Sequence, residues 1–296
     1  MSKFLTILTP TFNRSKLLID CYVSLKNQTL KDFEWIIIDD GSIDDTKAIV
    51  AELMSKNEID IKYFYKENGG KHTALNEGVK HAQGKLSLIL DSDDRLTPDA
   101  VGSINNYYKK YKEQKEIGSI SFLRCYSDGK IIGDTFNESE IISTYIDLIM
   151  NKGTKGDKSE VFVTDILRKY PFPVYKNERF IGEHVAWVRI ARKYKTLYIN
   201  KPIYITEYLE GGLTKSGRRL RINCPLGGME SSKETIDKNF NWRVRIKSMM
   251  LYICYGFFAK KKLNWMSKNS KQYLLFWSTL PAGIMLYHYW NVKYNN

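Results

Sequence analysis

Short apolar runs alternate with longer amphipathic segments along the first 125 residues. The apolar runs are rich in residues that favour β-structure and predict strands at residues 3–9, 33–39, 61–66, 85–90 and 117–125. The segments between them carry apolar residues at helical spacing and predict helices at residues 15–28, 46–56, 73–83 and 97–111. This alternation is typical of a mostly parallel α/β sheet flanked by helices.

Local signals indicate where these elements begin and end. Pro10 would end the first strand, because proline has no amide N–H to donate to a neighbouring strand. Asp44 or Asp45 would cap the second helix. Thr97 would cap the fourth helix, with Pro98 at its first position.

Three polar clusters follow predicted strands. They lie at residues 9–13, 39–42 and 91–94. Because doubly wound sheets bind ligands outside the carboxyl ends of their strands, we expect the clusters to line one ligand site.

The third cluster places Asp91, Asp93 and Asp94 within four positions. Carboxylates this close repel one another unless a cation joins them, and Mg²⁺ is typically held by one or two carboxylates together with substrate phosphates. A nucleotide diphosphate would complete such a metal shell. The alternative is a set of solvated charges beside a helix cap.

Two other motifs are excluded. An EF-hand starting at Asp91 would need Gly and Glu where Leu96 and Gly102 stand. The stretch GGKHT at residues 69–73 is not a phosphate-binding loop, because Tyr65 replaces its first Gly and His72 its Ser or Thr.

Charge is concentrated at the end of the chain. The formal net charge is +13, and residues 238–296 contain ten Lys or Arg and no Asp or Glu. Such a tail favours an anionic partner, either lipid head groups or nucleic acid, unless it is only a solvated basic face. The four cysteines are scattered, which favours a reducing compartment and argues against a zinc site.

Residues 273–290 carry no formal charge. As a helix they would extend about 27 Å, close to the roughly 30 Å of a hydrocarbon core, but Pro281 and Gly283 interrupt them. Spanning a membrane, lying in its interface and packing as an ordinary appendage all remain open. The interface fits the surrounding Trp, Tyr and Lys residues best. We therefore expect a cytoplasmic protein, peripheral on the inner face of the cell membrane, and no nucleic-acid partner.

The ordered motifs PTFNR, DDGS, NxG and DSDD resemble those of family-two glycosyltransferases of the bacterial surface-polysaccharide type. The resemblance covers residues 4 to about 210. It implies a GT-A fold, with a Rossmann-like nucleotide-sugar half at residues 1–125 and an acceptor half at residues 126–230. Residues 231–296 would form a basic, aromatic-rich helical tail.

The resemblance also implies roles for individual residues. Asp39 would accept a hydrogen bond from a uracil-like ring N–H. Asp93 and Asp94 would hold Mn²⁺ or Mg²⁺, although the sequence does not rank them against Asp91. The residues implied to line the base and ribose pocket are Pro10, Thr11, Phe12, Asn13 and Arg14. Those implied to border the rest of the nucleotide and the donor sugar are Gly69, Gly70, Lys71, Asn76, Asp91, Ser92 and Asp93.

In this family an acidic residue late in the catalytic domain serves as catalytic base, often within a Glu-Asp pair. Glu183 aligns with that acid, but His184 stands where Asp is common, so Glu178 remains a second candidate. The segment at residues 208–225 is glycine-rich and basic. We expect it to be a loop that closes over the donor, with Lys215, Arg218 and Arg219 near the diphosphate.

The predicted function is inverting, metal-dependent transfer of a sugar from a nucleotide-diphosphate donor, with UDP favoured, to a glycan or polyprenyl-linked saccharide. One alternative is a sugar-nucleotidyltransferase, although the segment TPTFNRS lacks the glycines that such enzymes carry after the first strand. The other is a non-catalytic basic module that binds membrane or nucleic acid, which explains the tail but not the ordered acids.

Overall fold

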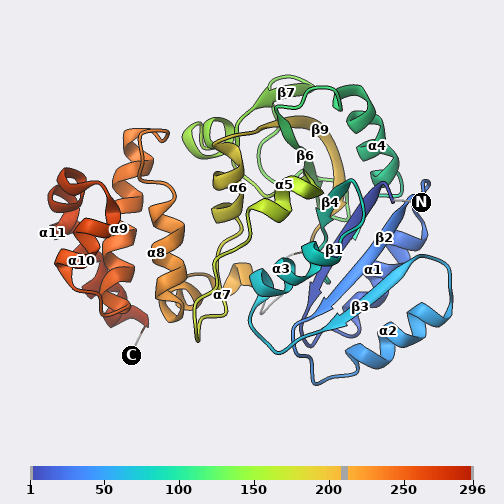
Figure 1. Cartoon of the computed structure of the whole chain (residues 1–296), viewed down its shortest axis with the longest axis horizontal. Coiled ribbons are helices and arrows are strands. Elements are labelled where there is room, and N and C mark those ends of the chain that lie inside the picture. Colours follow the sequence, from blue (N-terminus) through green and yellow to red (C-terminus); the bar gives the residue numbers. More distant parts are fainter. Residues whose placement is uncertain (1–2, 208–212, 295–296) are drawn as a thin grey trace. The chain divides into compact units, whose positions relative to one another are not determined.

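The computed structural model describes residues 3–207 and 213–294, with the backbone alone at residues 213–216 (Figure 1). The chain divides into two compact units. Unit 1 comprises Met1–Thr144, Thr154–Pro171 and Ile190–Glu207, and unit 2 comprises Tyr145–Gly153, Phe172–Arg189 and Tyr208–Asn296. Unit 2 therefore groups the predicted tail with parts of the predicted acceptor half. The predicted boundary at residue 230 stays a prediction.

The described residues of unit 1 form a nine-stranded sheet in the order β3-β2-β1-β4-β8-β6-β9-β5, with β7 paired to β9. Strands β1 to β4 are parallel, and β8 is antiparallel to both β4 and β6. The mostly parallel α/β sheet predicted from the sequence is thus confirmed. The strands are β1 (Leu5–Thr11), β2 (Phe33–Asp39), β3 (Ile61–Tyr65), β4 (Leu86–Ile89), β5 (Arg95–Leu96), β6 (Ile117–Cys125), β7 (Glu140–Ser143), β8 (Lys158–Val163) and β9 (Lys195–Ile205).

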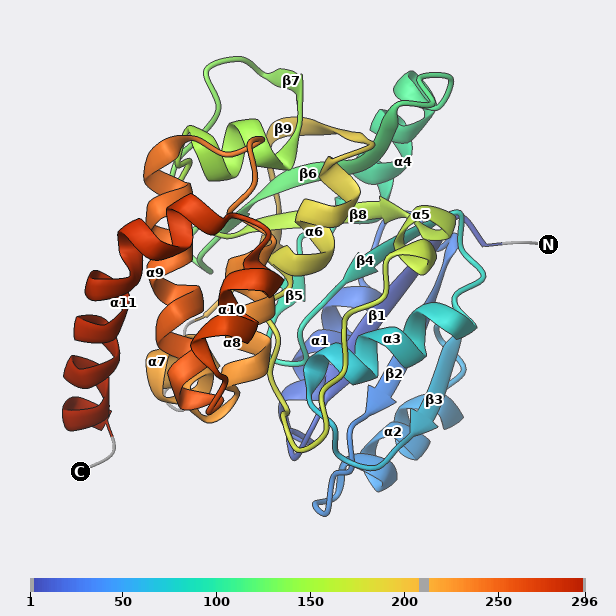
Figure 2. The same cartoon turned by 60° about the vertical axis from the view of Figure 1, so that its left-hand side comes forward.

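Helices cover both faces of this sheet. Helices α1 (Leu17–Lys26), α2 (Thr46–Ser55) and α4 (Ala100–Tyr111) contribute buried side chains to one core with the strands. Helices α3 (Lys71–His81) and α5 (Thr164–Lys169) contact each other on the opposite face, and Figure 2 shows α3 in front of β1, β2 and β3. Strands β1 and β2 are buried along their whole length, which explains their nearly continuous apolar sequences.

Two predicted boundaries are wrong, because in each case a neighbouring strand decides where the element begins or ends. Pro10 lies inside β1, because β1 pairs with β4 only as far as Leu8 in the described chain, so no partner needs the missing N–H. Helix α4 begins at Ala100, because the Thr97 amide still donates to the Ile203 carbonyl, 2.9 Å away, and continues the pairing of β5 with β9.

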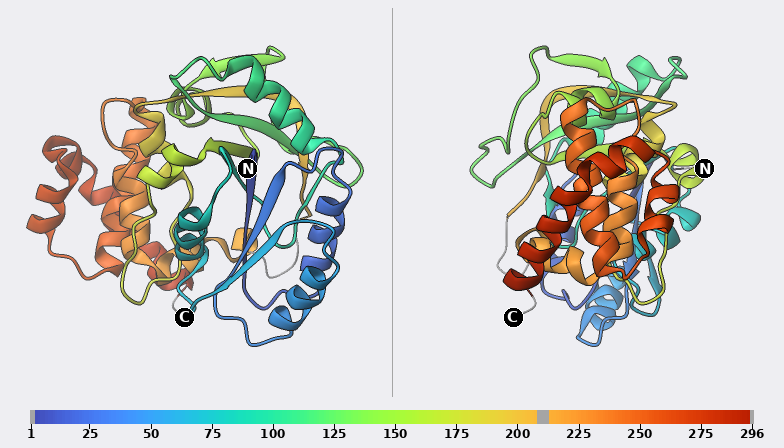
Figure 3. Two further views of the ribbon diagram at one scale, coloured as in Figure 1. Left: turned by 45° about the vertical axis from the view of Figure 1, so that its right-hand side comes forward. Right: turned by 90° about the vertical axis from the view of Figure 1, so that its left-hand side faces the viewer.

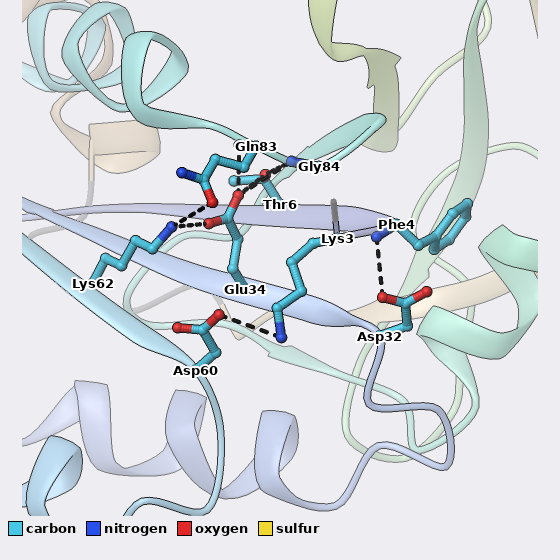
Figure 4. A network of polar contacts seen from close by, with 9 residues as sticks. All are labelled: Lys3, Phe4, Thr6, Asp32, Glu34, Asp60, Lys62, Gln83 and Gly84. Atoms are coloured by element: carbon cyan, nitrogen blue, oxygen red, sulfur yellow. Dashed lines mark hydrogen bonds and ion pairs between the residues drawn. The ribbon is translucent and has the colours of Figure 1, made fainter. Parts of the chain in front are cut away.

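Glu34 is a buried charge at the amino ends of the parallel strands (Figure 4). Its Oε1 accepts hydrogen bonds from Thr6 Oγ1 at 2.5 Å and from the Gln83 amide at 2.6 Å, and its Oε2 lies 2.6 Å from Lys62 Nζ. Burial alone would raise the pKa of Glu34, but the hydrogen bonds from Lys62, Thr6 and the Gln83 amide hold it below its ordinary value. The carboxylate therefore joins β1, β2, β3 and the turn that precedes β4.

Unit 2 is helical. Its core gathers side chains of α8, α9, α10 and α11, including Met229, Tyr252, Met266, Phe276 and Trp290. Figure 3 (right) shows α9 to α11 in orange and red. The remaining helices of the described chain are a π-helix at Ile146–Asn151, α6 (His184–Ala191), α7 (Leu213–Asn223), α8 (Pro225–Lys233), α9 (Trp242–Phe258), α10 (Leu263–Ser270) and α11 (Tyr273–Tyr294).

Residues 213–223, predicted to be a loop, form α7, which is interrupted at Gly217. The preceding residues 208–212 of that prediction lie outside the described part of the chain. All four cysteines are buried free thiols. None of the described helices combines the length and the apolar character needed to cross a membrane.

Candidate active site

The structure brings the three polar clusters to one edge of the sheet in unit 1. Strand β1 lies between β2 and β4, and the three run in parallel, so their carboxyl ends lie side by side. Thr11, the last residue of β1, pairs with Asp39, the last residue of β2. The expectation that the clusters share one edge is confirmed.

Asn13 ties the loop after β1 to the loop after β2. Its amide N–H donates to Ser42 Oγ at 2.8 Å, and its Oδ1 accepts from the Ile43 amide at 2.9 Å. Asn13 has a φ of 52°, a left-handed conformation that Asn tolerates better than most residues. The neighbouring Phe12 is 44% exposed, which leaves its ring open to stacking.

Asp39 is fixed by hydrogen bonds to both carboxylate oxygens. Oδ1 accepts from the Ser42 amide and Oδ2 accepts from the Tyr63 hydroxyl, each at 2.7 Å. The residue is buried at the end of β2. A carboxylate oxygen has two lone pairs, so a further donor such as a base N–H remains compatible with this arrangement.

Asp40 is a positioning residue that the sequence analysis missed. Its Oδ1 accepts from the Gly69 amide at 3.0 Å and from Lys66 Nζ at 2.7 Å, and its Oδ2 accepts from the Gly70 amide at 2.6 Å. Gly70 has a φ of 93°, which favours glycine. These contacts hold the turn that leads into α3 and so place Lys71 at the site. Asp40 is the second acid of the DDGS motif, and its place in that motif was the sequence signal that could have indicated this role.

Each acid of the DSDD turn faces a different basic side chain. Lys71 Nζ lies 2.5 Å from Asp91 Oδ1, and Arg14 Nη1 lies 2.6 Å from Asp93 Oδ2. Arg124 Nη1 lies 3.8 Å from an Asp94 carboxylate oxygen. Arg14 and Lys71, which the resemblance implied to line the nucleotide and donor-sugar site, pair with acids of this turn, and their predicted contacts with a nucleotide sugar stay predictions. Arg124 was not anticipated.

The acids of this turn differ in protonation behaviour. Burial, reinforced by the negative charges of Asp91 and Asp93, raises the pKa of Asp94 to about 7. Burial also acts to raise the pKa of Asp91, but the positive charges of Lys71 and Arg124 hold it below its ordinary value. Asp94 is thus the carboxylate whose charge is least compensated by the protein.

Tyr204 is a second residue that sequence reasoning missed. It lies fully buried on β9, where its hydroxyl accepts from the Asp91 amide at 2.9 Å and also hydrogen-bonds the Asp94 carboxylate. The guanidinium of Arg124 lies 4.1 Å from the centre of its ring. No motif surrounds Tyr204, so its role is visible only in three dimensions.

The donor set of this turn fits a divalent cation that is shared with a ligand. No group of three or more His, Cys, Asp or Glu side chains in the described chain is arranged to hold a metal by itself. Asp94 nevertheless lacks full charge compensation, and Asp93 lies one residue away. One or two carboxylates completed by phosphate oxygens is the typical Mg²⁺ arrangement.

Two other predicted residues of unit 1 lie in the same region. Asn76 is half-buried on α3, five residues after Lys71. Ser92 is 2% exposed within the acidic turn. Their predicted contacts with a nucleotide sugar stay predictions.

The two candidate bases belong to unit 2 and differ in their surroundings. The Glu178 carboxylate accepts the amide N–H groups of Leu226 and Gly227, at 2.7 Å each, and so caps the first turn of α8. Glu183 is half-buried directly before α6. The adjacent His184 has a lowered pKa because it is buried, and it hydrogen-bonds the backbone of Ser231.

The predicted diphosphate ligands of the later segment also belong to unit 2. The guanidinium of Arg218 lies 4.3 Å from the centre of the Trp290 ring. Arg219 is exposed on α7. The side chain of Lys215 lies outside the described residues.

Comparison with known proteins gives consistent results. The profile of glycosyl transferase family 2 matches residues 6–124. The GalNAc(5)-diNAcBac-PP-undecaprenol beta-1,3-glucosyltransferase of Campylobacter jejuni is 32% identical over 237 residues, which cover 77% of this chain and 73% of that protein.

Two solved structures share the fold. S. aureus TarS 1-349 in complex with UDP-GlcNAc has a TM-score of 0.66 and 17% identity, over 95% of this chain and 80% of that one. The mannosyltransferase PcManGT from Pyrobaculum calidifontis, in complex with GDP-Man and Mn²⁺, has a TM-score of 0.59 and 16% identity, over 97% and 86%. These likenesses confirm the predicted fold class, including its C-terminal helical region.

Proposed function

Because the chain belongs to glycosyltransferase family 2 and has a GT-A-like fold, we propose that it transfers a sugar from UDP to a lipid-linked saccharide with inversion. The transferred group would be a hexose or an N-acetylhexosamine. The observation that carries the proposal is the acidic turn after β4, where Asp94 stays undercompensated beside Asp91 and Asp93 at the ligand edge of the sheet. A bound diphosphate with its metal would complete this charge arrangement.

The nucleotide would occupy the ends of β1 and β2. The exposed ring of Phe12 would stack on the base, and Asp39 would accept the N3–H of uracil. Pro10, Thr11, Asn13 and Arg14 would line the ribose. The S. aureus neighbour was solved with UDP-GlcNAc and the Pyrobaculum neighbour with GDP-Man, so nucleotide sugars as a class suit this fold.

Asp93 and Asp94 would hold Mn²⁺ or Mg²⁺ against the diphosphate. When bound, the metal would supply positive charge that stabilises the departing UDP. Lys71 and Arg14 already lie within ion-pair distance of the acids and would contribute charge to the same region. Lys215 and Arg218 remain proposed as further diphosphate ligands.

Glu183 would act as general base. The acceptor hydroxyl would lose its proton to this carboxylate while its oxygen forms a bond to the anomeric carbon and the bond to the UDP oxygen breaks. One base and one displacement give inversion at that carbon. Glu178 suits the role less well, because its carboxylate already accepts two amide N–H groups of α8.

The acceptor would be a polyprenyl-linked saccharide in the assembly of a surface polysaccharide. The Campylobacter relative is named for an undecaprenol-linked glycan acceptor, which supports this choice. Since such acceptors are anchored in the cytoplasmic membrane, the enzyme would work at its inner face.

The proposal is tested with the full chain, a panel of UDP-sugars and polyprenyl-diphosphate saccharides, with Mn²⁺ or EDTA. The expected product is the acceptor extended by one sugar, and NMR should show that the anomeric configuration of the transferred sugar is inverted. EDTA should abolish product formation. Retained configuration would contradict the single displacement, and full activity in EDTA would contradict the metal. Transfer to soluble glycans alone would contradict the lipid-linked acceptor.

A further inference from the structure

Helix α11 is apolar on more than the face that packs. Its buried side chains Phe276 and Trp290 join the core of unit 2, and Gly283 approaches Ile253 of α9 so closely that a Cβ there would lie 2.6 Å from an Ile253 methyl. This accounts for one face of the helix. The opposite face is exposed and needs a separate explanation.

The exposed face carries a line of apolar residues, which we call the outer ridge, and the exposed polar residues Ser278 and His288 lie on the same side. Its members recur every three or four residues, as required for one side of a helix. It extends about 27 Å along the axis. The outer ridge consists of Leu274 (85% exposed), Trp277 (38%), Pro281, Met285 (66%), Tyr289 (58%) and Val292 (67%).

A helix face that meets only water normally carries charged and polar residues. The sequence of α11 contains one formal charge, Lys293 in its last turn. Single exposed apolar residues are ordinary, but six of them along one side of a helix indicate a surface that contacts a membrane or a protein.

The charged residues of the chain segment that carries the outer ridge are all of one sign. Residues 238–296 contain ten basic and no acidic residues. Lys260, Lys262, Lys268 and Lys271, in or beside α10, are exposed, and α10 packs against α11. An anionic lipid surface attracts such a cluster of basic residues.

Exposed aromatic rings in this region are paired with cations. Lys261 Nζ lies 5.3 Å from the centre of the Trp265 ring, and Lys293 Nζ lies 5.5 Å from that of Tyr289. Trp and Tyr with neighbouring Lys are typical of head-group depth in a bilayer. Protein interfaces, by contrast, are depleted in Lys.

We propose that the outer ridge of α11 inserts into the interface of an anionic phospholipid membrane, with the helix axis along the membrane surface. The lysines of α10 and of the preceding loop contact lipid phosphates, and the ridge side chains reach the acyl boundary. This inference goes beyond the proposed reaction and does not depend on it, since binding to lipid requires neither donor nor acceptor.

The test is flotation of the full chain with vesicles of phosphatidylcholine alone or with added phosphatidylglycerol. Wild type is expected to float with the anionic vesicles and, because the attraction is electrostatic, less well in high salt. Met285→Glu and Leu274→Glu should each weaken partition about tenfold or more. Each variant removes apolar surface that would enter the membrane and adds a negative charge that the anionic lipid repels. Val174→Glu is the matched control, since Val174 is 61% exposed outside α11. It should bind within about twofold of wild type, a difference of a few tenths of a kcal/mol.

A second readout locates the inserted face and does not depend on variant affinity. All four native cysteines are buried, so Met285→Cys supplies a thiol that an environment-sensitive dye labels selectively. The label at position 285 should shift to the blue with anionic vesicles, and a label introduced by Val174→Cys should not. Equal flotation of the Glu variants and wild type would overturn the proposal. So would an unshifted label, or a dimer of the chain that Met285→Glu dissociates.

Discussion

The guanidinium of Arg124 lies over the ring of Tyr204, 4.1 Å from its centre, and the hydroxyl of that tyrosine connects the Asp91 amide to the Asp94 carboxylate. A strand late in unit 1, β9, thus holds the acidic turn that follows β4. Since Tyr204 is fully buried, its hydroxyl has no water to replace these partners. Tyr204 positions the acids without itself contacting a ligand in this arrangement.

Tyr204→Phe should therefore weaken the proposed metal site while leaving the fold intact. The ring and its contact with Arg124 remain, but Asp94 loses a hydrogen bond and the Asp91 amide loses its acceptor. A hydrogen bond to a charged group contributes about 1.5–3 kcal/mol, so the Mn²⁺ concentration at half-maximal activity should rise about 10- to 100-fold.

The matched control is Tyr111→Phe. Tyr111 is the last residue of α4, and its hydroxyl donates a hydrogen bond to Glu140 of β7. The Mn²⁺ dependence of this variant should equal that of wild type. An unchanged Mn²⁺ dependence in Tyr204→Phe would show that the hydroxyl does not position the acids.

Glu183→Gln should lower turnover by about 10²–10⁴-fold, the usual contribution of general base catalysis, while donor binding is retained. Single-turnover transfer and calorimetric binding of UDP separate these two effects. Retained turnover in this variant would remove Glu183 from the proposed mechanism.

Glu178→Gln serves as the comparison, because the two acids lie five residues apart and only Glu178 caps α8. It should lower the melting temperature and leave the chemical step of the remaining folded enzyme nearly unchanged. A large loss of turnover without a loss of stability would exchange the proposed roles of the two residues.

His72 should make stability depend on pH. It is 2% exposed, neither ring nitrogen has a hydrogen-bond partner among the described residues, and burial lowers its pKa to about 4. The unfolded chain, with a pKa near 6.5, binds the proton more readily. Stability is therefore fully present above about pH 6.5 and is lost as the pH falls towards 4, by about 2 kcal/mol at pH 5.

Urea unfolding at pH 7.5 and at pH 5 checks this expectation. His72→Met replaces the ring with an apolar side chain of similar volume, so its free energy of unfolding should fall less between the two pH values. His288→Gln, at an exposed position of α11, should retain the wild-type difference. Equal pH dependence in His72→Met and wild type would contradict the buried neutral imidazole.

The sequence predicted the parallel part of the sheet because its strands are buried on both faces and so contain uninterrupted apolar stretches, such as residues 35–38 in β2. It also predicted which loops meet, because parallel strands bring their carboxyl ends to one edge. It failed at Pro10 and Thr97, where the neighbouring strand, rather than the local residue, decides the boundary.

Within the site, motif residues such as Arg14, Lys71 and Asp93 were predictable because they follow strands close to one another in the sheet. Arg124 and Tyr204 were not, because they come from β6 and β9, and their link to the acids depends on strand order. The structural use of Glu178 was equally hidden, since it depends on how α8 packs within unit 2.

The most direct test of the account is calorimetric binding of UDP to the full chain, in Mn²⁺ and in EDTA, for wild type, Asp94→Asn and the control Glu113→Gln at an exposed acid. We expect binding that requires Mn²⁺, a loss of about tenfold or more in Asp94→Asn and no change in Glu113→Gln. UDP affinity that is equal in Mn²⁺ and EDTA, or equal in Asp94→Asn and wild type, would contradict the claim that the acidic turn holds a metal against the diphosphate.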